Sequence, residues 1–225
     1  DMRWGENFME EVKILKQDVM PVHALPVYKE ETNFILTKDE LDTVLNQDYH
    51  ITKQSGKNGV KISKTDKVLE DEKLHRVKIF ILSRFNHYVE KILQIENCFY
   101  LTQSWSAING KDSTHHLHAH PNTILSCVYY AAANPDNGGE LRLKMQRSRL
   151  QEGFYFAYDK KEPNVFNSHA TDIKVKTGDI VMFPGWVDHE SLPNKSDEQR
   201  LIIGTNYFAV GKLGKVENKE FIEIG

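Results

Sequence analysis

Hydrophobic and polar positions follow two different periods along this chain, and the period changes near Asn97. Between positions 69 and 95, apolar residues recur at steps of three and four: Leu74, Val77, Phe80, Ile81, Phe85, Val89 and Ile92. This spacing predicts one long amphipathic helix that packs on a sheet. Earlier in the chain, Thr37 stands three residues before Glu40, a capping-box pattern that predicts a short helix through about Leu45. The polar stretch 54–67, rich in Lys, Ser and Gly, predicts an exposed loop.

Beyond Asn97 the apolar segments are short, β-branched or aromatic, and separated by turn residues. They cover positions 99–108, 123–131, 139–143, 153–157, 173–175, 179–183 and 201–209. Repeated strands with little helix between them predict a mainly β protein, a sandwich or a barrel with flanking helices.

Composition narrows the class of protein without naming an activity. A chain of 225 residues, 40% hydrophobic, can bury one substantial core. The formal net charge of −3 gives no overall attraction to nucleic acid or to an anionic membrane. Cys98 and Cys127 lie in apolar runs and are expected in the core, and two cysteines fit a reducing compartment. Without an apolar run long enough to span a bilayer, a cytoplasmic location is expected.

The chemistry begins with four histidines between positions 115 and 120. His118 and His120 are two residues apart, so on an extended strand both side chains point to the same face and two imidazoles can hold one metal ion. His115 and His116 are weaker candidates because they lie nearer a loop. A third histidine, His189, follows another buried strand after the break at 184–186.

Arg200 lies 11 residues beyond His189 and opens the last long strand. A planar guanidinium suits bidentate binding of a carboxylate. Three histidines at strand ends together with this arginine favour an iron site beside a pocket for an acidic co-substrate.

The residues between 105 and 208 resemble the iron(II)- and 2-oxoglutarate-dependent oxygenases. Within them, the chain resembles a family with the motifs His-x-His-Pro, Ser-Gly-Val-Tyr-Tyr, Phe-Pro-Ser-Trp-x-x-His and a later Arg. Here the motifs read His118-Ala119-His120-Pro121, Ser126-Cys127-Val128-Tyr129-Tyr130, Phe183-Pro184-Gly185-Trp186-Val187-Asp188-His189 and Arg200.

That resemblance implies a double-stranded β-helix, the jelly-roll or cupin-like fold. It divides the chain into an N-terminal extension with helices that pack on the sheet (1–96), a catalytic core (97–212) and a C-terminal tail (213–225). It also implies that His118, His120 and His189 bind Fe(II), and that Arg200 pairs with the far carboxylate of 2-oxoglutarate. Oxygen and 2-oxoglutarate would be consumed, succinate and CO2 released, and a substrate hydroxylated.

Two positions depart from the wider superfamily. The second metal ligand is usually Asp or Glu, whereas this chain has His120, so the iron would carry about one more positive charge. As alternatives, His120 lies outside the metal shell, or His116 and His118 form the pair. Superfamily members often place Ser two residues after the arginine, where this chain has Ile202.

Tyr129 and Asn206 lie on strands expected to face the pocket, so we expect them to bind the co-substrate; plain packing is the alternative. The segment 144–172, rich in Arg, Lys and aromatic residues, is a candidate lid or substrate surface, or an exposed hairpin. A peptide or a small molecule is favoured as substrate over nucleic acid, no membrane contact is expected, and a homo-oligomer stays open.

Two other functions compete with this interpretation. A three-His site in a small barrel also resembles the cupin thiol dioxygenases, which need no 2-oxo acid; Arg200 argues against them. The second is a non-catalytic β-sandwich that binds a metal or a ligand, which would surround its metal completely, whereas a catalytic site keeps one position open.

Overall fold

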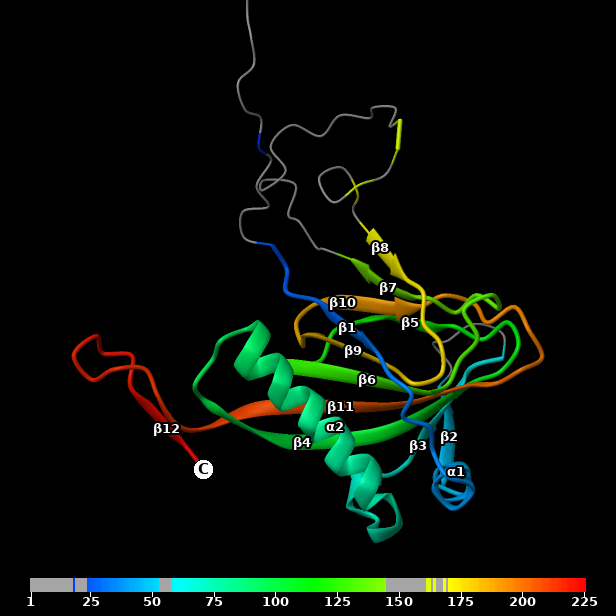
Figure 1. The fold of residues 1–225 in the computed structure, drawn as a ribbon, viewed down its shortest axis with the longest axis horizontal. Coiled ribbons are helices and arrows are strands. Elements are labelled where there is room, and N and C mark those ends of the chain that lie inside the picture. The colour runs from blue at the N-terminus through cyan, green and yellow to red at the C-terminus, as the bar shows by residue number, and fades with distance from the viewer. Residues whose placement is uncertain are drawn as a thin grey trace, which may run out of the picture.

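The computed structural model describes residues 18, 24–52, 58–144, 161–162, 164, 168 and 170–225. Two antiparallel sheets lie one above the other, with a helix across the outer face of the larger sheet (Figure 1). The expected mainly β class with flanking helices is confirmed.

The larger sheet has the strand order β1-β9-β6-β11-β4-β3-β2, and β12 pairs with β11. At its centre, β11 forms eleven register pairs with β4, between Arg200 and Val210 on one strand and Asn109 and Cys98 on the other. Its strands are β1 (Tyr28–Glu31), β2 (Tyr49–Thr52), β3 (Val60–Ser63), β4 (Cys98–Asn109), β6 (Leu125–Ala132), β9 (Asp179–Pro184), β11 (Arg200–Leu213) and β12 (Ile222–Ile224).

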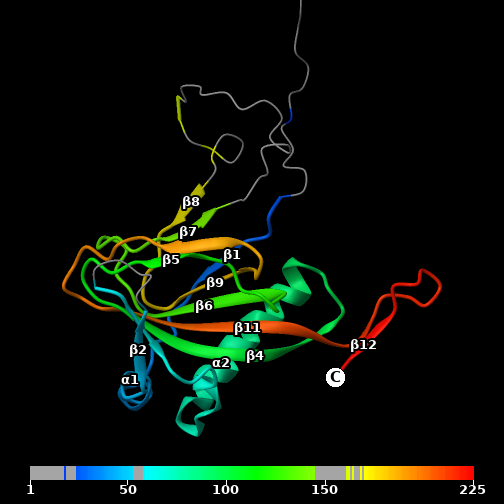
Figure 2. The ribbon, with the colours of Figure 1, turned by 180° about the vertical axis from the view of Figure 1, so that it is seen from behind.

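The smaller sheet has the order β5-β10-β7-β8 and lies over β6 and β9 in both ribbon views (Figure 2). Its strands are β5 (His115–His118), β7 (Leu141–Lys144), β8 (Ala170–Ile173) and β10 (Asp188–Ser191). A small apolar cluster that includes Tyr130, Leu141 and Phe183 joins the two sheets.

The helices follow the sequence pattern only in part. Thr37 caps α1 (Lys38–Leu45) through both bonds of the expected capping box. The predicted long helix is instead divided into the 3-10 turns Val68–Glu70 and Glu72–Leu74, α2 (His75–His87) and a π-helical turn, Tyr88–Ile92. α2 still buries the expected stripe of Val77, Ile81 and Phe85 against the outer face of the large sheet.

Alternation along the central strands separates the two faces of the large sheet. On β6, Leu125, Cys127 and Tyr129 belong to the cluster under α2. Their neighbours Ser126 and Tyr130 point the other way, toward the smaller sheet. The inner face is therefore where side chains from both sheets meet.

Several expectations need correction. The stretch 54–67 is not all loop, because Val60–Ser63 forms β3 and Val60 is fully buried. Residues before 97 do more than supply helices that pack on the sheet, because β1, β2 and β3 are strands of the sheet itself. Cys127 is buried as expected, but Cys98 is exposed at the start of β4.

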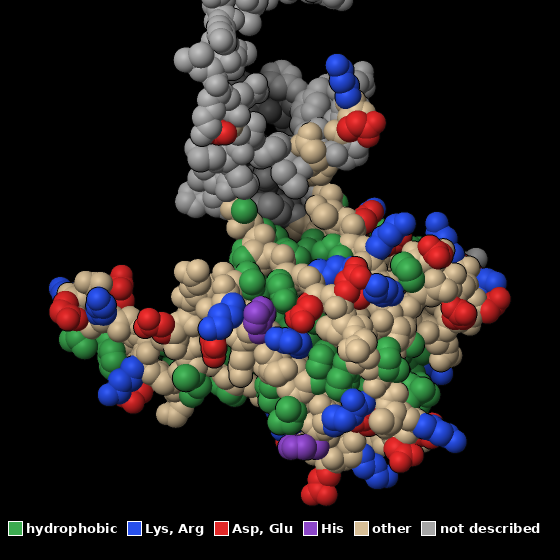
Figure 3. Space-filling view, viewed as in Figure 1, with side chains coloured by type: hydrophobic (Ala, Val, Ile, Leu, Met, Phe, Trp, Pro, Cys, Tyr) green, Lys and Arg blue, Asp and Glu red, His purple; other side chains and the backbone are tan. Residues whose placement is uncertain are grey.

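Part of the sequence interpretation lies outside the described residues. The expected strand 153–157 and most of the segment 144–172 fall there, so its role as a lid stays a prediction. Among the described helices, none is both long enough and apolar enough to cross a membrane. Acidic and basic side chains are mixed across the face seen in Figure 3, without a large patch of one sign.

Candidate active site

The smaller sheet brings two of the histidines together by direct strand pairing. In the antiparallel pair β5 and β10, His118 lies opposite His189, and their ring centroids are 4.3 Å apart. His120 follows two residues after His118, and its backbone N–H donates to the carbonyl of Gly185 at 2.9 Å. Its ring lies 5.1 Å from that of His118 and 4.9 Å from that of His189. One nitrogen of each ring lies within 4.8 Å of the other two.

Each of these three rings has its Nδ1 beside an oxygen that can only accept a hydrogen bond. The acceptors are the carbonyl of His116 for His118 (2.7 Å), the carbonyl of Val187 for His189 (2.9 Å) and Oδ1 of Asn206 for His120 (2.7 Å). Nδ1 must therefore carry the proton, which leaves a lone pair on each Nε2. This arrangement is the usual way in which proteins orient metal-binding histidines.

The Nε2 atoms of His120 and His189 lie 3.2 Å apart. With protons on both Nδ1 atoms, neither Nε2 has a hydrogen to share, so two lone pairs face each other. A cation bound by both nitrogens removes that repulsion. The residues present therefore fit a metal ion.

Burial keeps these imidazoles uncharged. Loss of solvent contact lowers the pKa of His189 to about 2 and that of His120 to about 4, and it also lowers the pKa of His118. At neutral pH the rings are therefore neutral and ready to bind a metal without losing a proton.

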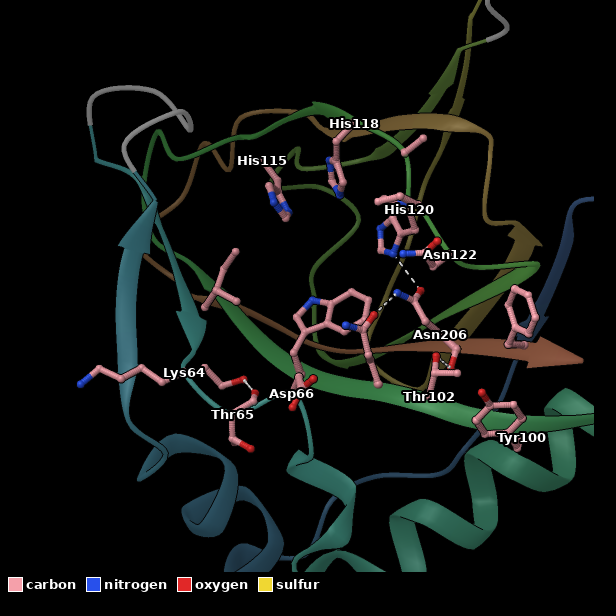
Figure 4. Close-up of a pocket in the computed structure, with 17 residues that line it drawn as sticks. Lys64, Thr65, Asp66, Tyr100, Thr102, His115, His118, His120, Asn122 and Asn206 are labelled. Atoms are coloured by element: carbon pink, nitrogen blue, oxygen red, sulfur yellow. Dashed lines mark hydrogen bonds between the residues drawn. The ribbon is translucent and has the colours of Figure 1, made fainter. Parts of the chain in front are cut away.

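Asn206 supports the site from the floor of the large sheet (Figure 4). On β11 it pairs across the strands with Gln103 of β4 and Ser126 of β6. Its Oδ1 also accepts a hydrogen bond from the Ser126 hydroxyl at 2.9 Å, and its Nδ2 donates to Oε1 of Gln103 at 2.9 Å. These bonds occupy the amide and orient the His120 ring, and co-substrate binding by Asn206 stays a prediction.

Arg200, at the start of β11, lies in an inner cavity beside the histidines. Its side chain is only 7% exposed, and Nη1 donates to the carbonyl of Gly139. Nε is buried without a hydrogen-bond partner, and no carboxylate of the described residues forms an ion pair with the guanidinium. Burial lowers the pKa of Arg200 from its usual value. An unpaired buried cation of this kind favours an anionic ligand.

The inner cavity, about 50 Å³, is narrow and mixed in polarity. Tyr130 and Ile202 line it beside Arg200, so the position two residues after the arginine does face the pocket, although it carries no hydroxyl. Its wall also includes Asn109, Leu141, Glu190, Ser191 and the three histidines.

Tyr129 does not reach this cavity, contrary to the expectation from sequence. It points to the α2 side, where its ring packs edge-on against Phe34 and Phe80 and its hydroxyl donates to the carbonyl of Phe34 at 2.9 Å. The neighbouring Tyr130 takes the position instead. Tyr130 and Ser126 are four residues apart on β6 and therefore share one face. Ser126 lies opposite Asn206, which identifies that face as the inner one.

A second, open groove of about 840 Å³ lies on the other side of the histidines (Figure 4). Trp105, His115, His118 and His120 line both the groove and the inner cavity. His118 and His120 therefore border both the recess that holds Arg200 and the open groove, and His189 lines the recess. Trp105 and Gln103 were not among the residues expected from sequence; no motif marks them.

Comparison with known proteins agrees with this geometry. Residues 103–206 match the model of the family described as "Putative 2OG-Fe(II) oxygenase". This part of the chain is therefore similar to the 2OG-Fe(II) oxygenases. Members of this family use Fe(II), 2-oxoglutarate and O2, and they are oxidoreductases. No curated protein matches the chain.

Several solved structures share the fold of this chain. A prolyl-4-hydroxylase from Pseudomonas putida is 15% identical with a TM-score of 0.53, over 83% of this chain and 94% of that one. HygX from Streptomyces hygroscopicus, with nickel and 2-oxoglutarate bound, is 11% identical with a TM-score of 0.54, over 81% and 82%. A prolyl hydroxylase from Trichoplax adhaerens, in complex with a hypoxia inducible factor peptide, is 18% identical with a TM-score of 0.53, over 81% and 83%. These likenesses establish the jelly-roll fold.

Proposed function

We propose that this 2OG-Fe(II) oxygenase binds Fe(II) through His118, His120 and His189 and hydroxylates a peptide or a small molecule in the open groove. The observation that carries the proposal is the convergence of three imidazole nitrogens beside a buried arginine that has no acidic partner among the described residues. The catalytic core that we propose spans residues 97–212.

Each residue has a separate task in this scheme. His118, His120 and His189 hold the metal, and their Nδ1 bonds fix the ring orientations. Bound iron supplies the coordination of the 2-oxo acid and oxygen and the oxidation of a substrate C–H bond. All three ligands are neutral, so the metal keeps its full double charge and suits a dianionic 2-oxo acid.

Arg200 would hold one carboxylate of 2-oxoglutarate, because its guanidinium is buried and its Nε has no acceptor among the described residues. Tyr130 lines the same recess and is placed to donate its hydroxyl to that carboxylate. The match of residues 103–206 to the 2OG-Fe(II) oxygenase family supports this scheme over a thiol dioxygenase.

The side chains that line the groove favour an uncharged substrate. Its hydrogen-bonding groups include Thr102, Gln103 and Asn122, and its aromatic residues include Tyr100 and Phe208. Among the described residues, the charged side chains in its wall are one lysine, Lys64, and one aspartate, Asp66, and they form no basic track for a nucleic-acid backbone. Relatives in fold bind both classes: one structure holds a peptide, another hygromycin B.

The decisive experiment is an anaerobic titration of the metal-free protein with Fe(II), with and without 2-oxoglutarate, recorded by visible absorption. We expect a metal-to-ligand charge-transfer band that requires both additions. His189→Ala removes the band because it removes a metal ligand. Arg200→Ala raises the 2-oxoglutarate concentration for half-saturation by roughly 10- to 100-fold, the effect of losing a charge-assisted hydrogen bond.

Arg142→Ala is the matched control, because this arginine pairs with Asp172 on the exposed part of the small sheet. Its band should equal that of the wild type. Tight Fe(II) binding without any band would contradict the proposal and favour the thiol dioxygenase. Absence of Fe(II) binding would favour a non-catalytic ligand-binding protein.

A further inference from the structure

The proposed iron site leaves His115 and His116 unused. On β5, three residue steps separate His115 from His118, whereas their partners on β10, Ser191 and His189, are two steps apart. One extra residue on β5 therefore forms a β-bulge, which interrupts the alternation of side chains. As a result, His115 and His118 both point into the groove although they are three residues apart (Figure 4).

The bulge produces a second triangle of histidines. The ring centroids of His115, His116 and His118 are separated by 5.2 Å, 4.4 Å and 5.0 Å. In the proposed iron site the corresponding distances are 4.3 Å, 4.9 Å and 5.1 Å. In both sets, one nitrogen from each ring lies within 4.8 Å of the others. The two triangles are alike in size and share one corner, His118.

A second observation points to a ligand at this triangle. Nδ1 of His116 is buried and has no hydrogen-bond partner in the part of the chain that the structure describes. A bound cation would give this nitrogen a partner if its proton is on Nε2. Three imidazoles without a carboxylate suit borderline metals such as Zn2+, Cu2+ and Ni2+, and three histidines with one water complete a tetrahedral zinc site.

We propose that His115, His116 and His118 form a second binding site for a divalent cation of the zinc type, and that this site excludes iron from the first. The exclusion follows from the shared residue. Nδ1 of His118 donates to the carbonyl of His116, so only Nε2 is free to bind a metal. An ion held by the second triangle removes one of the three ligands from the first.

The site is thus a metal-dependent switch for the enzyme. When zinc occupies the second triangle, only His120 and His189 are free to bind iron, and the iron site is incomplete. The ion binding itself rests on the second triangle alone, whereas the effect on iron rests on the proposed function.

Zn2+ binding to the His189→Ala protein tests the site directly, because this variant breaks the iron triangle and leaves the second one complete. Titration calorimetry should show one bound Zn2+ per chain. The double variant His116→Gln/His189→Ala should bind Zn2+ roughly tenfold more weakly or worse, since it loses one of three ligands.

His50→Gln/His189→Ala is the matched control, because His50 lies exposed on β2, and its Zn2+ affinity should equal that of His189→Ala. Circular dichroism spectra should show that all variants are folded. The proposal is overturned if His189→Ala binds no Zn2+, or if removal of His116 leaves its Zn2+ affinity unchanged.

A second arm measures the switch in otherwise wild-type protein. Zn2+ is added to the Fe(II) and 2-oxoglutarate complex while the charge-transfer band is followed. The His116→Gln protein should keep the band to a higher Zn2+ concentration than the wild type does. An equal concentration would contradict the switch. Failure of the proposed function would be recognised separately, as the absence of the band before any Zn2+ is added.

Discussion

The two faces of the large sheet differ sharply, although the same strands build both. On the outer face, Tyr129 and Tyr207 pack under α2 among apolar and aromatic residues. On the inner face, Ser126 and Asn206 belong to a hydrogen-bonded group that ends at the imidazole of His120, a proposed metal ligand. Because adjacent residues serve different faces, stability and chemistry can be altered separately, one position apart.

The largest change is expected on the outer face. Phe85 of α2 is 1% exposed and stacks on Tyr207 with 3.5 Å between ring centroids. Phe85→Ala leaves a cavity and should lower the free energy of unfolding by about 3–5 kcal/mol, measured by urea denaturation. Below its unfolding transition, the variant should still form the iron and 2-oxoglutarate band. Loss of the band in folded protein would show that the two faces are not separable.

A smaller effect, on binding instead of stability, is expected on the inner face. Asn206→Leu removes the acceptor for Nδ1 of His120, so Fe(II) affinity should fall roughly 10- to 100-fold in competition with a chelator. Asn206→Asp keeps an acceptor at the same place and should retain Fe(II) binding. If the leucine variant binds iron as tightly as the wild type, the side chain of Asn206 does not orient the ligand.

The finest comparison uses two neighbouring tyrosines. Tyr129→Phe loses a hydrogen bond to the Phe34 carbonyl and should cost about 1 kcal/mol of stability without changing 2-oxoglutarate binding. Tyr130→Phe should do the reverse, weakening 2-oxoglutarate binding several-fold, by about 1 kcal/mol, with stability little changed. The half-saturation of the charge-transfer band and the midpoint of urea unfolding measure both. Identical behaviour of the two variants would contradict the assignment of faces.

The sequence predicted the long central strands well, because they are apolar and continuous. β4, β6, β9 and β11 each overlap a predicted segment. Among the short strands, β7 overlaps the predicted segment 139–143, whereas β1, β2, β3, β10 and β12 were missed for a physical reason. β1 reads Tyr-Lys-Glu-Glu and is extended because it pairs with β9, not because of its own composition.

The site shows the same division. His118, His120, His189 and Arg200 could be located because their motifs fix their order, and the structure brings all four to one place. Tyr129 could not be assigned to a face from motif alone, since a shift of one residue reverses every side chain on a strand. The bulge in β5 depends on pairing with β10, so the side-chain positions of His115 and His116 could not be predicted from the sequence either.

Trp105 gives the protein an internal spectroscopic reporter. Its indole lies against Gly204, where any Cβ would come within 2.4 Å of the ring, and its centroid is 5.3 Å from that of His120. Glycine on β11 thus fixes a fluorophore beside a proposed metal ligand. A paramagnetic ion bound to His120 would quench its emission, so metal loading could be followed in the unlabelled protein by light alone.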